Sequence, residues 1–168
     1  FQQWSGILYR LKTIAVEAAF DAYLTAPLSQ FAVDLNMRSN GGNVRGPFVL
    51  NMTVPGWHGK GTVDLERLNL AHWLNREDRP SDISGRVEFD FALNLGHPPT
   101  GPYTFTGSHA EYFGYKADDI RATGTIVSNE ARIAKGSARA YGAGVTLNDS
   151  TISFDLPYRF RFAGHITE

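Results

Sequence analysis

The chain has 168 residues, a formal net charge of −1 and no cysteine. Because this length is typical of one domain, we expect a single domain over 1–168. The balanced charge gives no electrostatic basis for nucleic-acid binding, and the lack of cysteine excludes disulfides and thiolate metal sites. No apolar run reaches the roughly 20 residues of a membrane-spanning helix, and residues 1–10 do not have the pattern of a signal peptide.

The first segment, residues 5–24, fits two structural templates. Helical spacing is kept by Ile7, Leu11, Ile14 and Ala18. Strand spacing is kept by Ile14, Val16, Ala18 and Phe20. The β-rich remainder of the chain favours a strand, although short apolar runs are ambiguous.

Strict alternation of apolar and polar residues then recurs at 31–38, 48–54 and 87–95, with shorter matches at 62–65, 103–107 and 120–126. A period of two predicts β-strands with one apolar and one polar face. Turn signals rich in glycine, proline or asparagine separate these runs at 39–43, 54–61, 96–102, 141–144 and 147–150. Only 71–78 lacks alternation, and it predicts a short helical turn or a loop.

The longest alternating run is ISFDLPYRFRF at 152–162, which as one strand would extend about 35 Å. Because Pro157 cannot donate to a β-ladder, we expect this strand at a sheet edge or at a bulge. An open edge of this kind favours self-association or the binding of another strand.

Together these runs predict an all-β, mainly antiparallel protein. Three architectures satisfy such amphipathic strands. The apolar faces form the core of a closed β-sandwich, face lipid in a small membrane barrel, or line the concave side of a long open sheet curled into a taco-like groove.

The sequence contains no catalytic motif, and we expect no enzyme, metal or cofactor. The five histidines are scattered, without zinc-ligand spacing: His58, His72, His97, His109 and His165. His109 and Glu111 are close enough in sequence for an acid–base pair, but this spacing alone is weak evidence. Asp118 and Asp119 are too few for a calcium loop and favour a turn or the start of a strand.

Aromatic residues provide the other candidate site. Trp4, Trp57 and Trp73 are candidates for stacking on sugar rings, with Trp57 in PGWHG the best placed. The alternative is that these rings close the ends of a β core, where aromatic side chains are common. A β-sandwich that binds a glycan or a protein partner is therefore the alternative function.

Several phrases of the chain resemble the repeats of the AsmA-like superfamily, which includes the TamB translocation and assembly module proteins. They are VDLERLNL at 63–70, ISGRVEFDF at 83–91, ADDIRATGTI at 117–126 and SARAYGAGVTL at 137–147. The resemblance runs from about residue 14 onward and consists of strand and glycine patterns without catalytic signatures.

The resemblance implies a periplasmic segment of a Gram-negative-type envelope protein anchored in the inner membrane. It also implies an apolar groove through which phospholipids pass between the inner and outer membranes, with a role in outer-membrane assembly. Its expected partners are phospholipid acyl chains, an outer-membrane barrel protein, or a second copy through open strand edges. Because the chain begins at Phe1, we expect it to be a piece of a longer protein.

Strand parity within this sequence predicts the lipid-facing wall. Its members are the apolar residues of the four longest alternating runs: Phe31, Val33, Leu35, Met37, Phe48, Leu50, Met52, Val54, Val87, Phe89, Phe91, Leu93, Leu95, Ile152, Phe154, Leu156, Tyr158, Phe160 and Phe162. A conduit needs such a continuous apolar wall, because each buried CH₂ contributes about 0.8 kcal/mol. Parity alone leaves open whether every strand turns the same side to one groove.

Overall fold

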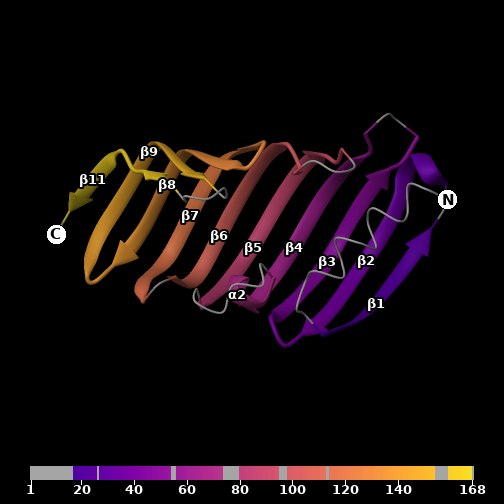
Figure 1. Cartoon of the computed structure of the whole chain (residues 1–168), viewed down its shortest axis with the longest axis horizontal. Helices are drawn as coiled ribbons and strands as arrows, with labels where there is room; N and C mark the ends of the chain where they lie inside the picture. The colour runs from indigo at the N-terminus through magenta and orange to yellow at the C-terminus, as the bar shows by residue number, and fades with distance from the viewer. Residues whose placement is uncertain are drawn as a thin grey trace.

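A computed structural model of the chain describes residues 17–25, 27–53, 56–73, 80–94, 98–112, 114–153 and 159–167. These residues form one open antiparallel sheet of 11 strands, which confirms the predicted all-β class (Figure 1). The strands are β1 (Ala18–Thr25), β2 (Phe31–Ser39), β3 (Gly42–Asn51), β4 (His58–Leu68), β5 (Ser81–Ala92), β6 (Gly101–Tyr112), β7 (Tyr115–Val127), β8 (Glu130–Ala140), β9 (Ala143–Ser153), β10 (Phe160–Arg161) and β11 (Gly164–Thr167). A 3₁₀ turn, η1 (Leu28–Gln30), precedes β2, and a short helix, α2 (Leu70–Trp73), follows β4.

The sheet is a simple meander in which each strand from β1 to β9 pairs with its neighbours in sequence. β10 and β11 both pair with β9, so the 11 strands occupy ten positions. The two ends of the sheet are far apart, with β1 at one end and β11 at the other (Figure 1). Among the described residues the sheet therefore has two open edges.

The described sheet is a single layer. Its strands make their main contacts with their sheet neighbours, while η1 contacts β3 and α2 contacts β5. The buried apolar side chains of the described residues are limited to Val33, Ala71, Ala131 and Ile133. The accessible surface of the chain is 11380 Å², whereas the size scaling of compact monomers gives roughly 8,200 Å². The alternative of a closed sandwich is therefore wrong.

Tight turns join several neighbouring strands where glycine or asparagine was expected to reverse the chain. Asn40 and Gly41 connect β2 to β3, and Tyr141 and Gly142 connect β8 to β9. The φ angles of Tyr141 and Gly142 are 53° and 86°, and two positive φ values are typical of the type I′ hairpin turn. The turn signals at 39–43 and 141–144 are therefore confirmed.

β-Bulges interrupt the ladders in the second half of the sheet and in β4. The register shifts between Leu65 and Leu68 in β4 and between Asp118 and Arg121 in β7. Arg67 and Asp119 lie at these shifts with φ values of 52° and 51°. A bulge lets two consecutive side chains point to one face, which explains why both Asp118 and Asp119 are exposed. These aspartates therefore lie within a strand, and their expected place in a turn or at a strand start was wrong.

The segment 152–162 does not form the single long strand that its alternation predicts. Ile152 in β9 lies opposite Phe160 in β10, and the Ser153 N–H donates to the Arg159 carbonyl at 2.9 Å. The chain thus reverses direction between these two strands. Pro157, which offers no ladder donor, stands between them in the sequence, and alternation cannot report such a reversal.

Three smaller predictions have mixed outcomes. Within 5–24, strand structure is confirmed from Ala18 onward, and positions before 17 lie outside the described residues. Within 71–78, residues 71–73 belong to α2, which confirms a short helical turn there. The LNDS stretch at 147–150 lies inside β9, so its expected turn is wrong.

Candidate functional site

The pairing register of the strands shows which side of the sheet each apolar strand face occupies. Residues directly opposite each other in adjacent strands lie on the same face. One such row crosses the sheet from β1 to β9 through Leu24, Val33, Phe48, Gly61, Phe89, Tyr103, Gly124, Ile133 and Ser150. We call the side of the sheet that carries this row the apolar face.

Most of the predicted wall lies on the apolar face. The ladders place these predicted residues there: Phe31, Val33, Leu35, Met37, Phe48, Leu50, Val87, Phe89, Phe91, Ile152 and Phe160. Leu93 reaches the same side beside Gly59, Phe162 stacks on Phe160 with ring centroids 6.1 Å apart, and Met52 follows β3 as a half-buried residue. Val54, Leu95, Phe154, Leu156 and Tyr158 lie outside the described residues.

Aromatic rings form the centre of the apolar face. The ring of Phe89 lies 6.3 Å from that of Phe48 and 5.3 Å from that of Phe91. Gly59 and Gly61 of β4 lie between these aromatic strands, and a Cβ on Gly61 would overlap the Phe48 Cβ. The rings therefore cover bare backbone, which keeps this part of the face continuous.

The sequence prediction missed most of the continuation of the face across β6 to β9, where it had included only Ile152. Added members include Tyr103 and Phe105 in β6, Ile120 and Ile126 in β7, Ile133 in β8, and Val145 and Leu147 in β9. The alternation of Tyr103 and Phe105 with threonines was a usable signal. In β7 to β9 the bulges and the many small residues break the period of two, so strict alternation could not identify these members.

Tyr103 brings a phenol onto this face. Burial raises the pKa of the Tyr103 hydroxyl above its usual value, because the phenolate would lose hydration there. The side chain lies between Phe89 and Gly124 in the ladders. The group therefore stays neutral over the physiological pH range.

The opposite side of the sheet carries ion pairs, and we call it the charged face. The pairs are Asp64–Arg86 at 2.8 Å, Lys60–Asp90 at 3.4 Å, Arg67–Asp82 at 3.6 Å, Glu111–Lys116 at 3.3 Å and Glu130–Arg132 at 3.1 Å. The hydrogen bond from Arg86 lowers the pKa of Asp64, and Asp64 in turn raises that of Arg86. Exposed pairs of this kind keep a surface hydrated and contribute little stability each.

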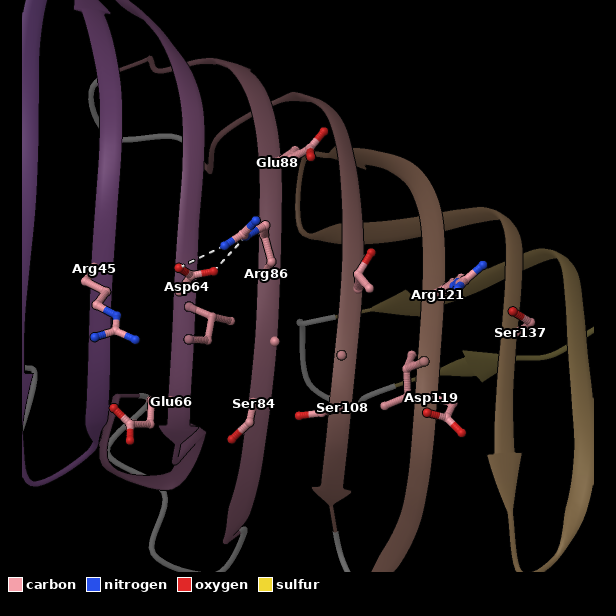
Figure 2. Close-up of a pocket in the computed structure, with 15 residues that line it drawn as sticks. Arg45, Asp64, Glu66, Ser84, Arg86, Glu88, Ser108, Asp119, Arg121 and Ser137 are labelled. Atoms are coloured by element: carbon pink, nitrogen blue, oxygen red, sulfur yellow. Dashed lines mark hydrogen bonds and ion pairs between the residues drawn. The ribbon is translucent and has the colours of Figure 1, made fainter.

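A shallow hollow of about 1030 Å³ lies on the charged face across β3 to β8 (Figure 2). Figure 2 shows Arg45 beside the Asp64–Arg86 pair, with Asp119 and Arg121 on the far side of the hollow. The bulges of β4 and β7 border this hollow, and bulges bend the strands that carry them. We expected the apolar side to be concave, but this hollow is on the other side.

Two of the described histidines, His58 and His109, take part in pairs that the sequence did not predict. His109 Nδ1 lies 2.7 Å from Asp118, whereas Glu111 pairs with Lys116, so the acid–base pair considered for His109 and Glu111 is not formed. His58 Nε2 lies 2.6 Å from Asp90. His72 belongs to α2, His165 is exposed on β11, and His97 lies outside the described residues.

The tryptophan site has little support in the described part of the chain. Trp57 is half-buried, and its carbonyl accepts a hydrogen bond from the Leu93 N–H at 2.9 Å. Trp4 and the side chain of Trp73 lie outside the description. No platform of several exposed tryptophans is therefore seen among the described residues.

No group of three or more histidine, aspartate or glutamate side chains gathers at a spacing suited to a metal ion within the described ranges. None of the described helices has both the length and the apolar character needed to cross a bilayer.

Fold and surface together define an all-β protein, a single-layer antiparallel meander with one apolar and one charged face. No protein-family model, curated protein or solved structure matches this chain. The resemblance to the AsmA-like superfamily therefore stays a prediction.

Proposed function

We propose that the chain is a non-enzymatic lipid-conducting segment whose apolar face binds phospholipid acyl chains. Following the resemblance, it takes part in phospholipid transport between the inner and outer membranes and in outer-membrane assembly. Its proposed location is the periplasm of a Gram-negative-type bacterium, as part of a protein anchored in the inner membrane.

The observation that carries this proposal is the continuity of the apolar face. Nine intervals of about 4.8 Å separate ten strand positions, which gives a face roughly 43 Å long. Because β1 to β9 have 8 to 13 residues each, the footprint of this face is on the order of 1,000 Å². Soluble monomers rarely expose more than a few hundred Å² of contiguous apolar surface, and larger areas mark interaction sites.

The chemistry of the face suits acyl chains better than a single shaped ligand. Its side chains are mainly aliphatic and aromatic, with Tyr103 as a phenol whose raised pKa keeps it uncharged. Each CH₂ that moves from water onto such a surface contributes up to about 0.8 kcal/mol. The paired charges of the opposite face keep that side of the sheet hydrated.

Two neighbouring residues of β3 provide a matched test. Val49 is 42% exposed and lies opposite Lys60 on the charged face, whereas Leu50 lies opposite Phe31 on the apolar face. Leu50→Asp places a carboxylate where acyl chains would lie, and Val49→Asp places the same group in water. Native mass spectrometry and lipid extraction of the purified proteins would measure bound lipid, with circular dichroism to check folding.

We expect two-chain lipids with the unmodified chain and with Val49→Asp, and their loss with Leu50→Asp. A folded, lipid-free unmodified chain would contradict the proposal. Equal loss in both folded variants would show that lipid does not bind through the apolar face.

A further inference from the structure

The two edges of the sheet are complementary in strand direction. β11 runs antiparallel to β9, and β1 runs in the same direction as β9 because the strands alternate along the meander. The 11 strands occupy ten positions, an even number. A β1 strand placed beside β11 would therefore be antiparallel to it, with both apolar faces on the same side of the combined sheet.

The two edges also differ in charge. The described residues 17–25 at the β1 edge include Glu17 and Asp21 and no basic residue. The described residues 159–167 at the other edge include Arg159, Arg161 and His165 and no acidic residue. All five side chains are exposed.

One row of the charged face connects these edges. It crosses every position of the sheet through Asp21, Asn36, Arg45, Asp64, Arg86, Thr106, Arg121, Ser137, Thr146 and His165. If β1 of another copy continued this row, its Asp21 would stand directly opposite His165. Cross-strand pairs of opposite charge are favourable, and like charges placed opposite each other are unfavourable.

Apolar side chains at both edges are unusually exposed. Leu24 on β1 is 56% exposed, while Phe162 and Ile166 at the other edge are 59% and 75% exposed. In the same register Leu24 of one copy would lie opposite Phe162 of the other. Edge pairing would thus cover apolar surface as well as satisfy backbone groups.

We propose that a second copy of this chain docks its β1 edge onto the β10–β11 edge, which extends one continuous antiparallel sheet head to tail. The contact is heterologous, so repeated docking lengthens the apolar face and does not stop at a symmetric dimer. A symmetric pairing of two β1 edges would bring two acidic edges together. The inference rests on the edges alone and does not require that the apolar face binds lipid.

Site-specific cross-linking tests this register, because the chain has no cysteine of its own. When Asp21 faces His165, antiparallel counting places Ala19 opposite Thr167. Directly opposite Cα atoms are about 4.5–5.5 Å apart, within the range that a disulfide spans. Ala19→Cys and Thr167→Cys proteins would be oxidised separately and as a mixture, and their products separated on non-reducing gels.

We expect disulfide-linked dimers in the mixture and little cross-linking in either protein alone. A double Ala19→Cys/Thr167→Cys protein should give a ladder of oligomers. Equal dimerisation of Ala19→Cys alone would overturn the proposal in favour of symmetric edge pairing. Absence of cross-links, together with a monomer at every concentration in sedimentation velocity, would overturn it as well.

A charge exchange separates specific pairing from chance collision. Asp21→Lys in the Ala19→Cys protein should reduce cross-linking with Thr167→Cys, because the exchange removes the carboxylate opposite His165 and adds a cation to an edge that would face a basic edge. His165→Glu in the Thr167→Cys protein should restore it. If cross-linking is not restored although both proteins are folded, Asp21 does not lie directly opposite His165 and the proposed register is wrong.

Discussion

Arg86 and Asp64 stand directly opposite each other on β5 and β4 and meet through two hydrogen bonds. Arg86 Nε donates to Oδ1 at 2.8 Å, and a terminal guanidinium nitrogen donates to Oδ2 at 3.3 Å. The pair lies at the centre of the charged row that crosses the sheet. This two-point geometry favours ionised Asp64, and for that reason its pKa is lowered.

Asp64→Asn should make a small, pH-dependent difference to stability. Because the folded-state pKa of Asp64 is lowered, its contribution is present above the unfolded value near 3.8 and is lost as the pH falls through the folded value. We expect a Tm loss of no more than about 3 °C at pH 7, since exposed pairs contribute little. Thermal unfolding at neutral and strongly acidic pH measures this difference. Asp34→Asn is the control, and an equal loss at both pH values would contradict the assignment.

Gly61→Ala should destabilise the sheet, because the new methyl group would overlap Phe48 and the Pro47 carbonyl. Overpacking of this kind costs about 1–3 kcal/mol of unfolding free energy. Gly136→Ala is a matched control in β8, where the nearest side-chain atoms would be 3.3 Å and 3.4 Å away. Urea unfolding would compare the two, and equal effects would show that the close approach of Phe48 is not the cause.

Asp119→Val should destabilise more than Asp119→Gly, because Asp119 has a φ of 51° at its bulge. A β-branched residue in this left-handed region costs on the order of 1–3 kcal/mol, whereas glycine is not strained there. Thr123→Val, on an exposed position of the same strand, is the control for β-propensity. If valine at 119 were tolerated as well as valine at 123, the bulge would not impose this backbone conformation.

Tyr103→Phe should reduce the loss of stability at alkaline pH. The folded-state pKa of Tyr103 is raised, so its contribution is fully present below the unfolded value of 10.0 and is lost as the pH rises further. Urea unfolding at about pH 8 and about pH 11 would show a smaller decrease for the variant than for the unmodified chain. Tyr115→Phe should leave that decrease unchanged, because Tyr115 is 74% exposed.

The sequence predicted the strands well where alternation is unbroken, and less well where the backbone departs from a regular ladder. Phe31 to Met37 and Val87 to Phe91 lie on the apolar face as parity requires. The extra residue of each bulge, such as Asp119, shifts the period of two by one residue, so a strict template of alternation fails there. The pairing of Ile152 with Phe160 shows a different limit. Two short antiparallel strands and one long strand give the same alternation when the connecting residues keep its parity.

The order of the strands has a consequence for how the protein is made. Every strand up to β9 pairs with the one synthesised immediately before it, so no pairing waits for a distant part of the chain. Contacts of such low sequence separation form quickly, because little loop entropy is lost before each hairpin closes. The sheet can therefore assemble strand by strand as the polypeptide leaves the ribosome or a translocation channel. At each stage the newest strand is the growing edge.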